Sequence, residues 1–489
     1  MAERTIPVIV GVAQVSQRVE HPREAREPLA LMEQALHGAA EDAGSRHLLE
    51  RAGALYVVRG VWPYRSPGDA LRARLGVHDA RLRTTPYGGN FVQTSINHAA
   101  RAISQEELEI ALLVGAENGH SQARAHKLGI ELRYSDCAGE RAERIAPEKP
   151  MVAAAELARG IQQPIQFYPL FDSALRRSKR ESIEANRARI AALWSGFSEV
   201  AASNPHAWIR KPYTALEIAT PSRDNRMIGF PYTKLLNSNN AVDQGAALVM
   251  CSVEAARRHG IPPERWIYLH AGTDGCDTDA VSERWDLCSS PAIRTAGRRV
   301  LELAGRSIDE LAHLDLYSCF PSAVEVARAE LGISPERCAT VTGGLTFAGG
   351  PLNNYVMHAV ATMVEVLRAD PGRFGLVTAN GGFLSKHAFG VYSSEPAARF
   401  AYANVQDEID TFPRRSSRVD AAGVADIEAY TVMHGHEGPT IAHVACLLPD
   451  GVRTWANSQD PELLMAMTSE ELCGRRAVLD GAGGLRLSG

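Results

Sequence analysis

The stretch Ile110-Ala111-Leu112-Leu113-Val114-Gly115 decides the fold class of this chain. It is a continuous apolar run of strand length, as expected for a strand that helices cover on both faces. A small-residue helix through Ser95, Ala99 and Ile103 is predicted before it, and the pair Gly88-Gly89 precedes that helix. This order of glycine turn, helix and buried strand is typical of an α/β unit.

The same pattern returns about 260 residues later in the sequence. Gly343-Gly344 precedes a helix predicted over 353–367, and that helix leads into the apolar run from Phe374 to Ala379. An internal repeat of this kind predicts two related α/β halves with mixed or parallel sheets. The other matching pairs are two strands at 6–13 and 266–271, two helices at 29–43 and 291–304, and two β-type segments at 55–58 and 314–317.

The rest of the chain divides into an insertion and a C-terminal region. Residues 118–240 carry Arg-rich helices without a continuous apolar strand, and the helix over 181–200 is expected to be exposed and amphipathic. Residues 397–489 hold short alternating segments between turn residues, which predicts a small β-rich domain, an open barrel of the OB-like kind. The two halves are then 1–117 with 241–258, and 259–396.

Composition excludes several classes of function. The 489 residues carry a net charge of −5 and no Lys/Arg-rich run, so no nucleic-acid partner is expected. No apolar run reaches the roughly 18 residues of a membrane span. Eight scattered cysteines without zinc-type spacing indicate a reduced, cytoplasmic compartment. No metal site is expected, because no cysteine partners His434, His436 and His443.

Five short segments, in order and at matching intervals, resemble the thiolase superfamily. The resemblance is greatest to sterol-carrier-type thiolases and to the thiolase-like proteins type 1, which have an additional C-terminal domain. It implies a layered αβαβα fold, a coenzyme A (CoA) thioester as substrate or ligand without a further cofactor, and either a homodimer or a monomer. The segments are Tyr87-Gly88-Gly89-Asn90, Gly115-Ala116-Glu117, Tyr317-Ser318-Cys319-Phe320, Gly349-Gly350-Pro351 and Asn380-Gly381-Gly382.

The residues of thiolase chemistry are replaced at each matching position. The resemblance places the nucleophilic cysteine at Gly89 or a neighbouring residue, yet no cysteine precedes Cys137. Gly350 replaces the histidine of the family's Gly-His-Pro turn, and the second cysteine falls on Ala379 or Asn380. Because the thiolate is the acyl acceptor, an ordinary thiolase mechanism is not expected. The expected substrate- or CoA-binding positions are Gly89, Asn90, Gly350, Asn380 and Gly381.

Four side chains remain as candidate catalytic groups. Cys319 keeps the cysteine of the family's His-Asp-Cys-Phe motif, and Tyr317 and Tyr355 could act as general acid or base. His387 follows the Asn380 turn and could reach the same pocket as a base. Each has a structural alternative: a buried core cysteine, packed tyrosines and a surface-loop histidine.

Three functions follow from these residues. The first is a divergent, acetyl-CoA acetyltransferase-like protein that binds acyl-CoA thioesters without the usual nucleophile. The second is a lyase that uses tyrosines in a retro-aldol reaction on a β-hydroxyacyl-CoA, as the resemblance to steroid side-chain aldolases of this superfamily implies. The third is a non-catalytic acyl-CoA-binding or assembly subunit.

Overall fold

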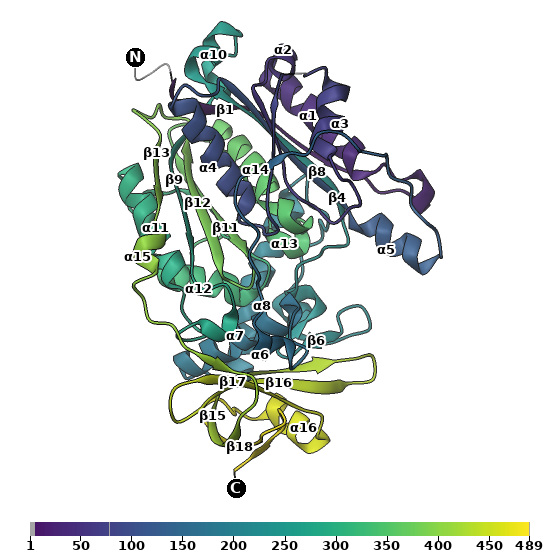
Figure 1. Ribbon diagram of the computed structural model, residues 1–489, viewed down its shortest axis with the longest axis vertical. Coiled ribbons are helices and arrows are strands. Elements are labelled where there is room, and N and C mark those ends of the chain that lie inside the picture. The colour runs from purple at the N-terminus through teal and green to yellow at the C-terminus, as the bar shows by residue number, and fades with distance from the viewer. Residues whose placement is uncertain (1–4, 78, 489) are drawn as a thin grey trace.

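A computed structural model describes residues 5–77 and 79–488 of the chain (Figure 1). Within these residues the larger body is built on one mixed sheet of eleven strands. The N-terminal half contributes strands in the spatial order β1 (Pro7–Ser16), β8 (Asp243–Ser252), β4 (Ile110–Asn118), β2 (Ala54–Val57), β3 (Arg81–Thr84) and β5 (Glu143–Arg144).

The C-terminal half continues the same sheet. Its order is β10 (His313–Asp315), β11 (Phe374–Gly381), β12 (Lys386–Ser393) and β9 (Ile267–Cys276). The halves join where Val8 and Ile9 of β1 pair with Tyr268 and Ile267 of β9. Parallel pairs such as β2–β4 stand beside antiparallel pairs such as β4–β8. The prediction of two α/β halves with mixed sheets is confirmed.

Helices form three layers around the two halves of the sheet. Helices α4 (Phe91–Ser104) and α14 (Tyr355–Ala369) lie between the halves, and each contacts strands of both (Figure 1). Helix α1 (Pro28–Ala43) covers the outer face of the first half, and α11 (Pro291–Ala304) covers that of the second. A helix enclosed on all sides needs apolar residues around its circumference, and α14 has them. The αβαβα layering is confirmed.

Most of the insertion lies between the sheet body and the C-terminal domain in Figure 1, whereas its first helix projects from the side of the body. Its main helices are α5 (Gly119–Lys127), α7 (Pro164–Lys179) and α8 (Ile183–Ser203). The sequence predicts an amphipathic helix here, and α8 accordingly has one buried face. Trp194 and Phe197 are buried with their rings stacked 5.0 Å apart, and Trp194 Nε1 donates a hydrogen bond to Thr346 Oγ1 at 3.0 Å.

A second sheet forms the β-rich C-terminal domain. Its spatial order is β14 (Ser417–Arg418), β17 (Arg453–Ser458), β16 (Pro439–Leu447), β15 (Ala422–His434), β18 (Arg476–Asp480) and β19 (Leu485–Leu487). Strand β6 (Met227–Gly229) of the insertion pairs with β15 and with β7 (Tyr232–Thr233). Conversely, β13 (Ala401–Asn404) pairs with β9 of the body. The C-terminal sheet therefore contains two strands of the insertion, and the sheet of the body contains one strand of the C-terminal region.

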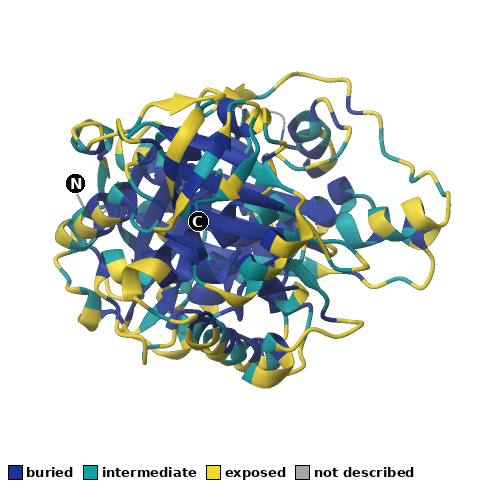
Figure 2. Cartoon of the chain, turned by 90° about the horizontal axis from the view of Figure 1, so that it is seen from below, coloured by how far each residue is buried: buried dark blue, intermediate teal, exposed yellow. Residues whose placement is uncertain are grey.

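A buried arginine of the C-terminal domain forms an ion pair within that domain and hydrogen bonds to the body. Arg453, with no exposed side-chain area, pairs with Glu428 at 2.7 Å. The same guanidinium donates to the backbone oxygens of Ser282 and Arg284 in the body. Seen from the C-terminal end, the centre of the molecule is buried (Figure 2). None of the helices within residues 5–77 and 79–488 has the length and apolarity needed to cross a bilayer.

Candidate functional site

A cavity of about 340 Å³ opens where five parts of the chain meet, one of which is the segment 345–353 before α14 (Tyr355–Ala369). Its other walls come from the turn before α4, the insertion, the segment from β10 to α12 (Pro321–Leu331), and the turn between β11 and β12. The apolar walls include Met151, Pro164, Leu345 and Phe383. The polar groups are neutral ones, among them Tyr168, Tyr317, Cys319, Asn353 and Asn380. No Asp, Glu, Lys, Arg or His side chain of the described residues lines this cavity.

The hydroxyl of Tyr317 lies close to the position that a side chain at residue 89 would occupy. A Cβ atom on Gly89 would lie 2.4 Å from Tyr317 Oη and 2.7 Å from the backbone oxygen of Asn380. Contacts this short force a neighbour to move, so glycine is the residue that fits here. The Tyr317 ring stands edge-on to that of Tyr355, with 5.6 Å between centroids. Burial raises the pKa of Tyr317 well above its usual value, so the phenol keeps its proton.

Backbone donors stand at the same place, where helix α4 begins. The N–H groups of Gly89 and Asn90 have no hydrogen-bond acceptor within residues 5–77 and 79–488. The Asn90 side chain does not cap the helix. Free N–H groups at a helix N-terminus bind carbonyl oxygens and anions, because the helix dipole adds positive potential there. The arrangement can therefore polarise a carbonyl group lying against Gly89.

Cys319 lies in a hydrogen-bonded group with Tyr168 and Asn380. Asn380 Nδ2 donates to Tyr168 Oη at 2.9 Å and lies 3.9 Å from Cys319 Sγ. The backbone N–H of Leu384 also donates to Tyr168 Oη, at 3.1 Å. Burial raises the pKa of the Cys319 thiol to about 12. A thiol held neutral in this way is a poor nucleophile.

Two leucines near the cavity have left-handed backbone conformations. Leu352, which lines the cavity, has φ +44°, and Leu384, whose N–H contacts Tyr168, has φ +59°. Left-handed backbone costs a non-glycine residue of the order of 1–3 kcal/mol and is concentrated at functional sites. The fold therefore holds these turns against local strain, and both turns shape the cavity.

Comparison with known proteins identifies the same fold in a protein of similar length. The crystal structure of a monomeric SCP2-thiolase like protein type 1 from Mycobacterium smegmatis is 29% identical, covers 100% of both chains and superposes with a TM-score of 0.86. The family described as thiolase-like protein type 1 additional C-terminal domain matches residues 404–481. The chain therefore resembles the thiolase-like proteins type 1 both in its whole fold and in its C-terminal domain.

Other relatives of this chain are more distant. Acetyl-CoA acetyltransferase of Methanothermobacter thermautotrophicus is 22% identical over 246 residues, which is 47% of this chain and 62% of the relative. The chain thus spans less than two thirds of the curated relatives that it matches. The structure of an Ltp2-ChsH2(DUF35) aldolase, 19% identical with a TM-score of 0.59 over 79% of this chain and 98% of that one, shows a shared fold.

Tyr355, an expected catalytic residue of this chain, does not line the cavity. Its side chain is fully buried, and its hydroxyl donates to Asp315 Oδ1 at 2.8 Å and lies 2.7 Å from Thr342 Oγ1. The Asp315 carboxylate is buried as well and accepts several hydrogen bonds, so the phenol of Tyr355 serves to satisfy it. The structure therefore leaves Tyr355 as a support for the Tyr317 ring, which corrects the expected catalytic role.

His387 also lies away from the cavity. The alternative of a surface-loop histidine does not hold, because β12 begins at Lys386 and His387 is buried within it. Its Nε2 atom lies 3.1 Å from the backbone oxygen of Leu384 and 3.7 Å from Asp277 Oδ2. Asp277 in turn pairs with Arg284 at 3.2 Å. The expected role of His387 as a base in the pocket therefore does not fit its position.

The expected binding positions divide into two groups. Gly89, Asn380 and Gly381 line the cavity. Gly350 is not among the lining residues, and its N–H donates to the backbone oxygen of Asn239 at 2.9 Å, so it has no free donor for a ligand. Asn90 lies at the start of α4 with Oδ1 buried and without a partner among the described residues.

The sequence did not indicate two residues that line the cavity, Tyr168 and Asn353. Tyr168 comes from α7 of the insertion, which the sequence presents as a helical region without a motif. Asn353 follows the Gly-Gly-Pro turn, where the candidate site residues predicted from the sequence were its neighbours Gly350 and Tyr355. An Asn two residues after that turn is the signal that could have found Asn353. No group of three or more His, Cys, Asp or Glu side chains in the described part of the chain is arranged to hold a metal ion.

Proposed function

We propose that this protein binds an acyl-CoA thioester non-covalently, with its carbonyl group against Gly89. The observation that carries this proposal is the neutral lining of the cavity, in which the Tyr317 hydroxyl and free backbone N–H groups lie at Gly89. A neutral phenol and amide N–H groups donate hydrogen bonds to a carbonyl oxygen. The apolar walls around Met151, Leu345 and Phe383 suit an acyl chain.

The same lining argues against acyl transfer. Thiolysis needs a thiolate that accepts the acyl group and a base that moves a proton at the α-carbon. The Cys319 thiol has a pKa raised to about 12, and no charged side chain of the described residues faces the cavity. No further cofactor enters the proposal, in which CoA thioesters are ligands.

Titration calorimetry with acetyl-CoA, CoA and longer acyl-CoAs tests the proposal directly. Binding is expected for the thioesters, and Tyr317→Phe is expected to weaken it about threefold to tenfold, because one hydrogen bond is lost. Mass spectrometry after incubation with acetyl-CoA is expected to show no acetyl adduct on Cys319. An adduct, or consumption of acetoacetyl-CoA with free CoA, would contradict the proposal, as would the absence of binding at millimolar concentration.

A retro-aldol lyase is the second candidate, favoured by one observation. No hydrogen-bond partner of Tyr317 Oη is found among the described residues, so this hydroxyl is available to a substrate. Burial raises the pKa of Tyr317, so its phenol stays protonated and can donate a hydrogen bond to a substrate oxygen, although it is a weaker acid than an exposed phenol. Incubation with a β-hydroxyacyl-CoA, followed by mass spectrometry for a shortened acyl-CoA and a carbonyl product, separates this lyase from a binding protein.

A monomer in a reducing compartment completes the proposal. Strand β5 of the same chain pairs with β3, so β3 does not offer a free edge to a second copy of the chain. The similar protein from Mycobacterium smegmatis is described as monomeric. All eight cysteines are free thiols. Light scattering coupled to size exclusion is expected to give a mass near 53 kDa, and a dimer mass would overturn this part.

A further inference from the structure

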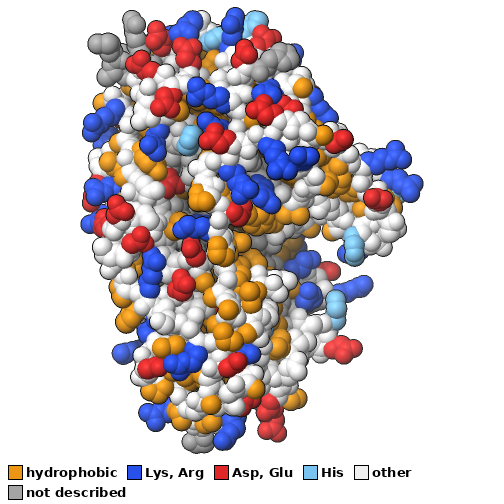
Figure 3. Space-filling view, in the orientation of Figure 1, with side chains coloured by type: hydrophobic (Ala, Val, Ile, Leu, Met, Phe, Trp, Pro, Cys, Tyr) orange, Lys and Arg blue, Asp and Glu red, His pale blue; other side chains and the backbone are white. Residues whose placement is uncertain are grey.

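A second pocket, of about 310 Å³, lies beside the main cavity and is lined by four arginines. They are Arg59, Arg65, Arg141 and Arg144, and together with Thr84 and Thr85 they form what we call the arginine pocket. Figure 3 shows Lys and Arg side chains gathered over this half of the molecule. A chain with a net charge of −5 has no general excess of cations, so four arginines around one hollow require a local reason.

The positive charge of the arginine pocket is only partly neutralised. The Glu148 carboxylate lies 3.5 Å from Arg59 Nη1 and 3.7 Å from Arg144 Nη1. No acidic partner of Arg65 or Arg141 is found among the described residues. The other nearby acids are engaged elsewhere: Glu143 with Arg83, and Glu140 with Arg72. Like charges brought together repel, and a bound anion removes that cost.

A helix end adds to this potential. Helix α3 (Pro67–Leu75) begins at the pocket, which Ser66, Pro67 and Gly68 line. The Ser66 side chain does not cap the helix, because its hydroxyl donates to the backbone oxygen of Gly139 at 2.9 Å. Pro67 has no N–H, so the backbone donors that stay free at this helix end are those of Gly68 and Asp69, and they keep their capacity to bind an anion.

Two contacts connect the arginine pocket to the main cavity. The Asn353 side chain lines the cavity, accepts a hydrogen bond from Gly88 N at 3.1 Å and donates to the backbone oxygen of Arg59 at 2.7 Å. Glu148 Oε1 accepts from the backbone N–H of Tyr87 at 3.1 Å. Tyr87 lines both the main cavity and an open groove of about 750 Å³, and Arg59 and Trp62 line both that groove and the arginine pocket.

We infer that the arginine pocket binds the phosphate groups of a ligand whose other end enters the main cavity. Guanidinium groups bind phosphate oxygens through paired hydrogen bonds, and the groove offers a continuous path between the two sites. This inference rests on the proposed function, under which the ligand is an acyl-CoA and the phosphates are those of its nucleotide end. Glu148 then acts as an internal anion that the phosphates displace from Arg59 and Arg144.

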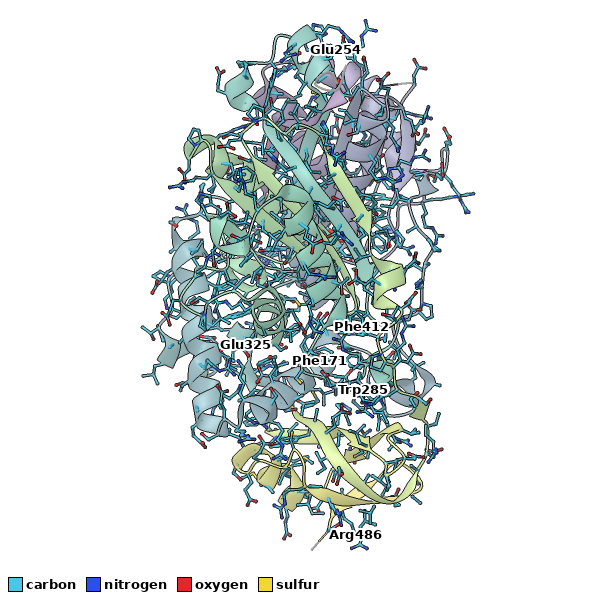
Figure 4. The ribbon with its side chains drawn as sticks, turned by 90° about the vertical axis from the view of Figure 1, so that its left-hand side faces the viewer. Phe171, Glu254, Trp285, Glu325, Phe412 and Arg486 are labelled. Carbon is cyan, nitrogen blue, oxygen red and sulfur yellow. The ribbon has the colours of Figure 1, made fainter. Side chains whose placement is uncertain are left out.

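Calorimetry with three probes separates the two sites. CoA carries phosphates and the thiol arm, acetyl-pantetheine carries the acyl arm alone, and inorganic pyrophosphate carries the anion alone. Arg65→Ala with Arg141→Ala is expected to weaken CoA and pyrophosphate at least about fivefold and to leave acetyl-pantetheine unchanged. Glu148→Gln is expected to strengthen pyrophosphate, because two arginines lose their partner. Arg486→Ala is the control, since Figure 4 shows Arg486 at the far end of the C-terminal domain.

The outcomes distinguish failure of this inference from failure of the proposed function. If CoA binds the double arginine variant as tightly as it binds the original chain, the arginine pocket is not its phosphate site. If acetyl-pantetheine and CoA both fail to bind but pyrophosphate binds through Arg65 and Arg141, the proposed function falls and the anion site stands. Pyrophosphate binding that Arg486→Ala weakens as much as the double variant does would show general attraction to surface charge and overturn the inference.

Discussion

The fit between Gly89 and Tyr317 gives the most direct test of the site. Gly89→Ala would place a methyl group 2.4 Å from Tyr317 Oη and 2.7 Å from the backbone oxygen of Asn380. Ordinary van der Waals contact begins near 3.4 Å, so one neighbour must move by about 1 Å and the other by somewhat less. Overpacking of this size costs about 1–3 kcal/mol. We therefore expect Gly89→Ala to lower the melting temperature by about 1–3 °C.

A double variant shows whether the phenol causes this cost. Tyr317→Phe alone is expected to change stability by less than about 0.5 kcal/mol, because its hydroxyl makes no hydrogen bond to the described residues. With the hydroxyl absent, Gly89→Ala loses its shortest contact and keeps those with the Asn380 backbone oxygen and the Tyr317 ring, so the combined loss should be smaller than the sum of the single losses. Residues in contact show such coupling at about 0.5–3 kcal/mol.

The assay is thermal and urea unfolding followed by tryptophan fluorescence, with Gly196→Ala as the matched control. Gly196 lies in α8, and a Cβ there would meet no atom within 4 Å. That substitution should stabilise the chain by about 0.5–1 kcal/mol, because alanine favours the helix. If Gly89→Ala is as stable as the original chain, or if its loss and that of Tyr317→Phe simply add, the hydroxyl does not occupy the space beside Gly89.

Three further predictions concern pH, the domain interface and thiol reactivity. Burial raises the pKa of the Glu117 carboxyl to about 7, so the folded state loses stability as the pH rises from about 4.5 to 7 and stays lower above that. Glu117→Gln should be more stable than the original chain at pH 8, by roughly 3 kcal/mol at most, and the difference should vanish below pH 4.5 in melting curves. Arg453→Met leaves Glu428 without its 2.7 Å partner and should lower the free energy of unfolding by about 3–5 kcal/mol. We expect this loss to appear as faster proteolysis between the body and the C-terminal domain. The double variant Arg453→Met with Glu428→Gln should recover part of the lost stability. Iodoacetamide at pH 8 should label the exposed Cys338 and spare Cys319, and peptide mapping that finds Cys319 labelled first would show it to be a nucleophile.

Much of the layered fold was predictable because its signals are local. The helix predicted over 291–304 is α11 with the same bounds, and the continuous apolar runs became β4 and β11. Strands β4 and β11 are buried on both faces, which explains why their sequences are apolar at nearly every position. Strand β12 was not predicted, since it begins with Lys386 and His387, two residues that seldom lie in a buried strand. Lys386 lies over the Phe91 ring, and His387 contacts the Leu384 backbone oxygen, which permits their burial.

The candidate site was less predictable because it depends on contacts between distant segments. Tyr168 meets Asn380 across 212 positions of sequence, and no spacing reveals such a pair. Sequence also does not tell on which side of a helix or strand a tyrosine hydroxyl lies. Tyr317 faces Gly89, whereas the buried Asp315 carboxylate accepts the hydroxyl of Tyr355. Both residues were expected in one pocket, and a single buried acid decides between them.

The exchange of strands between the two sheets sets an order of assembly during synthesis. Gly229 of β6 pairs with Met433 of β15, which leaves the ribosome about 200 residues later. At about 5–20 residues per second, β6 waits roughly 10–40 s for that partner, with only β7 beside it. Strand β13 must likewise emerge before the edge of β9 is complete. The nascent insertion therefore stays unfinished until nearly the whole chain has been made, and a chaperone has that interval in which to act.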